Sequence, residues 1–171
     1  MRQFHTFAPV YDASSRVLIL GSFPSVRSRE EGFYYGHPRN RFWQVISEVL
    51  AEPLPLTIPE KRELLLKNRI ALWDVCSSCE ITGSSDATIS KVVPNDLSLL
   101  LTTAKISLIC TNGRTADKLY RRFVRNIDIP ERCLPSTSPA NAVWTVDRLI
   151  SEWNIIKEVI CNDQHQFENR G

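Results

Sequence analysis

Short apolar runs alternate along the chain with amphipathic segments, and this alternation predicts the fold class. The run over 16–21 ends at a glycine and is typical of a strand buried on both faces of a parallel sheet. Further strands are predicted over 69–75, 105–110 and 132–135, and helices over 41–50, 60–67, 95–104, 114–124 and 143–160. The pattern predicts an α/β fold, a three-layer α/β/α sandwich whose central, mainly parallel sheet has about four strands.

Length and composition predict one domain, 1–171. The chain has 171 residues, of which 43% are hydrophobic, and no Gly/Ser/Pro-rich stretch divides it. Its apolar runs fall short of the ~20 residues that cross a bilayer, and its start lacks the apolar core of a signal peptide. We therefore expect a cytoplasmic monomer that does not contact membranes.

The five cysteines do not indicate a disulfide framework, because their number is odd and their spacing irregular. Cys76 and Cys79 form a single CxxC pair, and no second CxxC or histidine pair supplies the remaining ligands of a zinc or iron–sulfur site. We expect neither a bound metal nor another cofactor.

A net charge of only +2 does not favour indiscriminate coating of nucleic acid. Local clusters matter more, because two basic groups are suited to binding phosphates. The first comprises Arg27, Arg29, Arg39 and Arg41, and the second Lys118, Arg121, Arg122 and Arg125. The second group is equally consistent with a solvated helix face.

Polar segments that follow the predicted strands indicate where a site would lie. Ligands of open parallel sheets bind outside the carboxyl ends of the strands, which here means after Gly21, Asp74, Asn112 and Pro135. The aromatic-rich stretch over 22–39 is also longer than an ordinary connection, which is typical of functional loops.

Three motifs in these segments resemble the uracil-DNA glycosylase superfamily. They are G-S-F-P-S over 21–25, G-F-Y-Y-G-H-P-R-N-R-F-W over 32–43 and L-P-S-T-S-P-A-N over 134–141. Mismatch-specific uracil glycosylases carry a similar G-x-N-P-G loop, a G-F-x-F-A-H-P-x-N-R-F-W segment and a later N-P-S-type loop. The resemblance extends from Val17 to about Glu158 and implies an enzyme that flips a base out of DNA and hydrolyses its N-glycosidic bond.

Departures from the family pattern narrow the resemblance. Phe23 stands where typical members have the Asn that helps to place the attacking water, and Ser136 stands where a His or Asn is expected. This combination is similar to the hypoxanthine-DNA glycosylase branch. No lysine of the motif loops is placed to form a Schiff base, so we expect water to be the nucleophile of a monofunctional enzyme.

The resemblance implies that Tyr35 stacks on the flipped base, although Phe33, Tyr34 and Tyr35 are equally the kind of residue that packs beneath a loop. Asp74 stands where relatives often place a base-reading Asn. It would accept the N1–H of hypoxanthine, or donate if protonated, or else tie its own loop. We also assign base contacts to Phe23, Ser136 and Ser138.

Asn40 is the candidate catalytic residue, because the resemblance associates an Asn of the second motif with activity in the hypoxanthine branch. Cleavage requires a water positioned at the sugar carbon and stabilisation of the departing base, but no strong base. The alternative role of Asn40 is to cap the helix that follows it, a contribution of about 1 kcal/mol.

Contacts with DNA are assigned to Ser25, His37, Arg39 and Asn141. His37 would orient a phosphate or polarise the base, or else bond the loop backbone, while Asn141 would fill the gap left in the duplex. The expected partner is DNA that contains a deaminated base, and the expected role is base excision repair of deoxyinosine. Two other hypotheses stay open: excision of uracil from mismatches or single strands, and a non-catalytic DNA-binding protein on the same scaffold.

Overall fold

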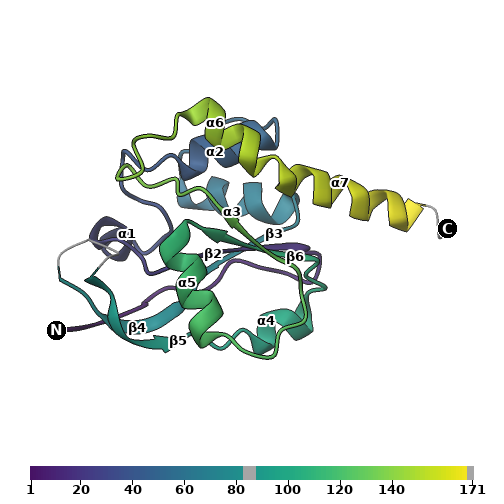
Figure 1. Ribbon diagram of the computed structural model, residues 1–171. Coiled ribbons are helices and arrows are strands. Elements are labelled where there is room, and N and C mark those ends of the chain that lie inside the picture. Colours follow the sequence, from purple (N-terminus) through teal and green to yellow (C-terminus); the bar gives the residue numbers. More distant parts are fainter. Residues whose placement is uncertain (83–87, 169–171) are drawn as a thin grey trace.

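The computed structural model describes residues 1–82 and 88–168 and confirms the α/β class (Figure 1). Its centre is a four-stranded parallel sheet in the order β3-β2-β6-β7. The strands of this sheet are β2 (Val17–Gly21), β3 (Ile70–Asp74), β6 (Leu108–Asn112) and β7 (Glu131–Leu134). The four strands were predicted from the sequence, with ends that differ by at most three residues from the observed ones.

The register of the sheet brings the ends of its strands together. Gly21 pairs with Asp74 across β2 and β3, and Asn112 pairs with Leu134 across β6 and β7. Because all neighbouring pairs are parallel, the segments that leave these four residues start from one edge of the sheet.

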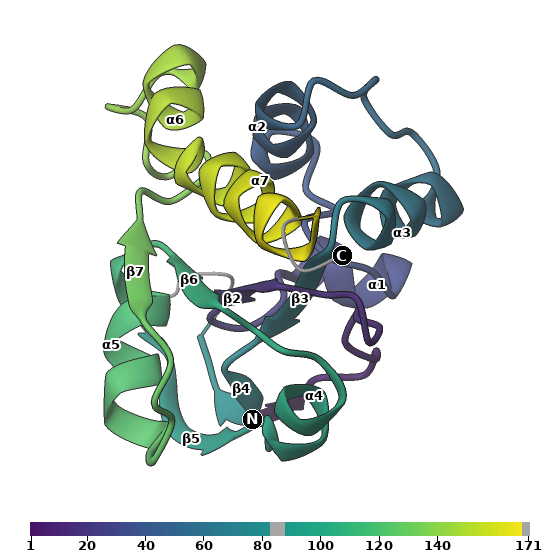
Figure 2. The same ribbon diagram turned by 90° about the vertical axis from the view of Figure 1, so that its right-hand side faces the viewer.

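Helices cover both faces of the sheet, as the predicted three-layer arrangement requires (Figure 2). On one face, Val17 and Ile19 pack against a layer that comprises α2 (Phe42–Val49), α3 (Ile58–Lys67), α6 (Val146–Trp153) and α7 (Ile155–Glu168). On the other face, Leu18 and Leu20 pack against α4 (Ser98–Thr103) and α5 (Arg114–Phe123). The short helix α1 (Val26–Glu31) follows β2 and lies within the loop predicted over 22–39.

Capping residues explain where two helices differ from the prediction. Thr57 and Glu60 form a capping box, so α3 begins at Ile58 rather than after Pro59. The single helix predicted over 143–160 is wrong at its start and in its middle. Thr145 accepts a hydrogen bond from the Arg148 N–H and begins the helix late, and Asn154 separates α6 from α7.

A second sheet was not predicted. The strands β1 (Arg2–Phe4), β4 (Cys76–Glu80) and β5 (Ser90–Pro94) form an antiparallel sheet in the order β1-β4-β5. The sequence indicated a polar loop from 77 to 90, because the serines of β4 conceal any alternation; of that loop, 83–87 lie outside the described residues. This small sheet carries the N-terminal segment to the carboxyl end of β3.

Among the described residues, no helix combines the length and the apolar character needed to span a membrane.

Candidate active site

Three residues meet where β2 and β3 end. An ideal Cβ built on Gly21 would lie 2.3 Å from Asp74 Oδ1 and 3.1 Å from the Tyr35 hydroxyl oxygen. Glycine is therefore required at position 21, since any side chain would displace the carboxylate. The sequence-predicted Tyr35 and Asp74 thus approach the same point of the sheet edge.

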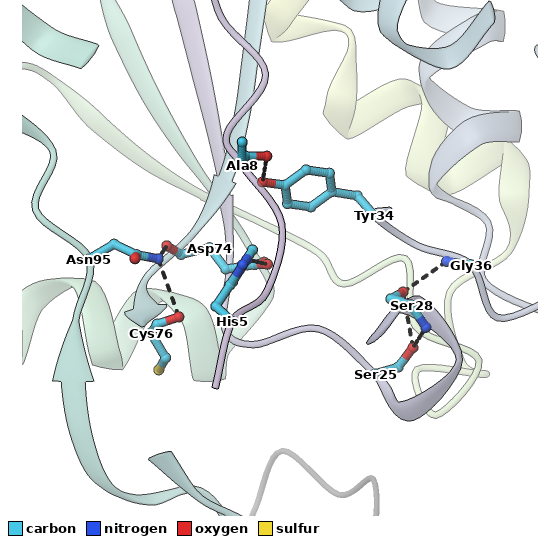
Figure 3. Close-up of polar contacts among 9 residues, drawn as sticks. All are labelled: His5, Ala8, Ser25, Ser28, Tyr34, Gly36, Asp74, Cys76 and Asn95. Atoms are coloured by element: carbon cyan, nitrogen blue, oxygen red, sulfur yellow. Dashed lines mark hydrogen bonds and ion pairs between the residues drawn. The ribbon is translucent and has the colours of Figure 1, made fainter. Parts of the chain in front are cut away.

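Asp74 is buried and is held by residues from outside its own loop. Its Oδ2 lies 2.8 Å from His5 Nε2, and the two side chains are only 5% and 3% exposed. Its backbone carbonyl accepts a hydrogen bond of 2.8 Å from the Asn95 side-chain amide (Figure 3). Sequence reasoning missed His5, because it lies outside the three motifs.

The three consecutive aromatic residues of the second motif have different environments. Phe33 and Tyr34 are buried, and the Tyr34 hydroxyl donates to the Ala8 carbonyl at 2.8 Å, so these two have the packing role (Figure 3). Burial raises the pKa of Tyr34, which keeps its hydroxyl protonated. Tyr35 is only half-buried, and its backbone is left-handed (φ 53°). One face of its ring stacks on Phe42, with the two ring centres 4.1 Å apart.

Asn40 belongs to a hydrogen-bond chain that joins three segments. Its Oδ1 accepts from the Phe42 N–H at 2.9 Å and from the Thr137 hydroxyl at 2.9 Å. Asn112, at the end of β6, bonds both the hydroxyl and the N–H of the fully buried Thr137. Because the Phe42 N–H can only donate, the oxygen of Asn40 is fixed, and its NH₂ group is the part left to act on another molecule.

The segment from Ser136 to Trp144 is held in place by Arg41. The Arg41 guanidinium donates to the carbonyls of Trp144, Ser138 and Asn141. Both terminal nitrogens of Arg41 thus bind this loop, a role that the sequence did not indicate, and its predicted contact with phosphate stays a prediction. The loop also binds itself: Ser136 Oγ accepts from the Ser138 N–H, and the Asn141 amide donates to the Ser136 carbonyl.

Comparison with known proteins now decides the family. A sequence model of the uracil DNA glycosylase superfamily matches residues 8–158. The chain belongs to this superfamily. The predicted resemblance is confirmed, and it covers the sheet, the Asn40 chain and the loop that Arg41 binds.

Two related proteins and the solved structure of a third protein are similar to this chain over most of its length. A protein named hypoxanthine DNA glycosylase from Methanosarcina acetivorans is 39% identical over 152 residues, which cover 88% of this chain and 95% of that protein. One of the same name from Methanosarcina barkeri is 34% identical over 137 residues (79% and 86%). The solution NMR structure of a candidate uracil DNA glycosylase from M. acetivorans has a TM-score of 0.80 at 35% identity, covering 93% and 99% of the two chains.

The first superfamily motif places Phe23 in an apolar environment. Its side chain is buried with Cys76 and Cys79, and the Arg29 guanidinium lies 5.5 Å from its ring centre. Its predicted contact with a base stays a prediction. Both cysteines are buried in the core, and no cluster of three metal-ligating side chains occurs in 1–82 and 88–168.

Two of the residues predicted to contact DNA, Ser25 and His37, have hydrogen-bond partners within the protein. Ser25 caps α1 by accepting from the Ser28 N–H, and Ser28 in turn accepts from the Gly36 N–H (Figure 3). His37 Nδ1 accepts from the Arg39 N–H at 3.1 Å, which is the backbone-bonding alternative. The Arg39 side chain is exposed. Their contacts with DNA stay predictions.

Three of the six other predicted basic residues have polar partners within the protein. Arg27 pairs with Glu31 at 2.7 Å, and Arg29 donates to the Gln3 side chain at 2.6 Å. In the second cluster, Arg121 pairs with Asp117 and Glu131. Burial and the neighbouring Asp117 raise the pKa of Glu131 to about 7.

Proposed function

We propose that this protein is a monofunctional DNA glycosylase that flips hypoxanthine out of DNA and hydrolyses its N-glycosidic bond. In this proposal it acts as a cytoplasmic monomer, without a cofactor, on DNA that contains the deaminated base. The observation that carries the proposal is the meeting of the Asp74 carboxylate and the Tyr35 hydroxyl over Gly21. Its base preference is supported by two relatives named hypoxanthine DNA glycosylase.

A flipped purine fits this point of the sheet edge chemically. Phe42 supports one face of the Tyr35 ring, so the ring is held as a platform for stacking. The ionised Asp74 is acceptor-only and matches the N1–H of hypoxanthine. The serines of the Ser136–Asn141 loop would contact the base edge or the adjoining phosphate.

Asn40 supplies the group that acts on water. With Oδ1 engaged by Phe42 and Thr137, its Nδ2 donates to the oxygen of a water and leaves a second lone pair for the sugar carbon. The transition state resembles an oxocarbenium ion, which is itself strongly electrophilic, so positioning replaces a strong base. The water adds to the sugar carbon as the bond to the base nitrogen breaks, and its proton is lost to solvent.

The proposal also includes residues that contact the DNA around the flipped nucleotide. Arg39, His37 and Ser25 would bind phosphates, and Asn141 would enter the gap left by the flipped nucleotide. Val143, which sequence reasoning did not single out, is 81% exposed in the same loop and adds an apolar side chain for that gap.

The direct test uses duplexes with a single deoxyinosine, uracil, xanthine or thymine opposite each normal base, followed by alkaline cleavage at abasic sites. We expect cleavage at deoxyinosine, and no covalent complex after borohydride reduction because water is the nucleophile. Binding without abasic product would instead support a non-catalytic DNA-binding protein.

Uracil excision is the second candidate function, because the similar solved structure is described as a candidate uracil DNA glycosylase. The Asp74 carboxylate would accept the N3–H of uracil as it accepts the N1–H of hypoxanthine. In the same panel, a higher single-turnover rate on uracil than on deoxyinosine decides for this alternative.

A further inference from the structure

The N-terminal segment brings a histidine to the proposed base site. Backbone pairing of β1 with β4 and a 2.8 Å bond from the His5 N–H to the Ser77 carbonyl fix this segment beside the end of β3. The imidazole lies against Phe7 and Tyr34, with ring centres 4.5 and 5.9 Å apart. The side chain is 3% exposed and turns toward Asp74 (Figure 3).

His5 contacts one oxygen of Asp74 and leaves the other for a ligand. Nε2 lies 2.8 Å from Oδ2, whereas Oδ1 lies over Gly21 beside the Tyr35 hydroxyl. A carboxylate bonded at one oxygen by a buried ring has little freedom to rotate. The pair therefore fixes which oxygen lies over Gly21, at the point that the two site residues share.

We propose that His5 is a positioning residue that holds Asp74 as an ionised acceptor, and that this pair selects hypoxanthine against adenine. The proposal rests on the function proposed above and adds the origin of base discrimination. His5 donates its Nε2 proton to Oδ2, and Oδ1 accepts the N1–H of the flipped base.

The two purines differ at the atom that Oδ1 would meet. Hypoxanthine carries a hydrogen at N1, whereas N1 of adenine is a lone pair that repels a carboxylate oxygen. Without the His5 donor the carboxylate is free to turn, so Oδ1 is no longer held where it would meet N1, and the preference for a base with a hydrogen at N1 is lost.

The competing explanation is that His5 only packs within the aromatic cluster of Phe7, Phe23 and Tyr34. His5→Phe keeps an aromatic ring but removes the donor, whereas His5→Gln keeps an amide donor but removes the ring. If His5 only packs, His5→Phe should keep more of the parental activity than His5→Gln. If His5 positions Asp74, His5→Gln should keep more. Phe7→Leu is the matched control, because it disturbs the packing around the His5 ring while both members of the His5–Asp74 pair keep their side chains.

The experiment measures single-turnover release of hypoxanthine and of adenine from the same single-stranded sequence, with thermal unfolding in parallel. We expect His5→Phe to lower hypoxanthine release roughly 10- to 100-fold, the effect of losing a hydrogen bond to a charged group, and to lower the hypoxanthine-to-adenine rate ratio. His5→Gln should recover most of both, and Phe7→Leu should leave the ratio as in the parent.

A double-mutant cycle with Asp74→Asn keeps the test decisive even if His5→Phe folds poorly, because Asn removes the unpaired buried charge. If His5 acts through Asp74, His5→Phe has little further effect in the Asp74→Asn background. Independent, multiplying losses overturn the proposal, as does parental release by His5→Phe. An active parent with either result leaves the glycosylase function intact, whereas an inactive parent refutes the proposed function itself.

Discussion

Replacing Asn40 tests the proposed chemistry at the residue on which it most depends. Asn40→Ala removes the oxygen that accepts from the Phe42 N–H and the Thr137 hydroxyl. A hydrogen bond contributes about 0.5–1.5 kcal/mol net, so the two together predict a loss of about 1–3 kcal/mol in the free energy of unfolding. Asn40→Asp keeps an oxygen that accepts both hydrogen bonds, and its charge suits the start of α2, so we expect near-parental stability.

The two Asn40 variants should both lose activity, although only Asn40→Ala should lose stability. Asn40→Ala should lower single-turnover release of hypoxanthine at least ~100-fold, the scale of deleting one positioned transition-state group. Asn40→Asp lacks the Nδ2 donor and should retain only partial activity, although its fold is intact. Release is measured by alkaline cleavage of a deoxyinosine duplex with enzyme in excess, and stability by urea unfolding.

Thr137→Val provides the matched control for the anchoring role. It removes the hydrogen bond to Oδ1 but leaves the amide of Asn40 in place, so stability should fall with a smaller loss of activity than in Asn40→Ala. Near-parental release by Asn40→Ala refutes the catalytic role. Equal losses of activity in Asn40→Ala and Thr137→Val would mean that Asn40 only anchors the loop.

Three further substitutions test other parts of the site and the fold. Tyr35→Ala should weaken release of a flipped base by about 1–3 kcal/mol of lost stacking while the melting temperature changes little; unchanged single-turnover release would remove Tyr35 from the site. Arg41→Lys keeps the charge but not the fork that binds three carbonyls, so both loop protection in hydrogen exchange and excision should fall, and parental values for both would contradict the anchoring role. Glu131 has a pKa raised from 4.5 to about 7, so the folded state binds more protons than the unfolded state between these values and stability should decrease as pH rises through that window. Glu131→Gln should flatten this dependence in urea unfolding at about pH 5 and about pH 8, and a parental slope in the variant would assign the dependence to other groups.

The parallel sheet and the site residues Gly21, Tyr35 and Asp74 could be predicted from the sequence, because short local patterns identify them. A continuous apolar run that ends in a polar residue marks a doubly buried parallel strand, and parallel pairing places Gly21 and Asp74 at one edge. Tyr35 was predicted at this edge from the motif, although composition alone did not distinguish it from Tyr34.

His5 could not be predicted from such signals. Its contact with Asp74 joins residues 69 positions apart and depends on pairing between β1 and β4, a strand whose serines do not alternate with apolar residues. The loop contacts of Arg41 could not be predicted for a related reason. Its acceptors are backbone carbonyls, which every residue carries, so nothing in the sequence distinguishes an arginine that binds a loop from one that binds phosphate.

Phe23, which replaces the Asn of typical relatives, is part of the packed core as well as a lost polar group. Phe23 is 7% exposed, and it packs on Cys76 and Cys79 of β4, the strand that also holds the His5 segment. An Asn at this position would leave a cavity and place an amide among thiols, at a cost of several kcal/mol. Restoring the first-loop Asn of typical relatives by a single substitution is therefore expected to destabilise the fold. Under the proposed function, a chain with Phe23 needs another residue to place the water. We assign this role to Asn40, whose side-chain oxygen is fixed by two hydrogen bonds and whose NH₂ group is left to donate.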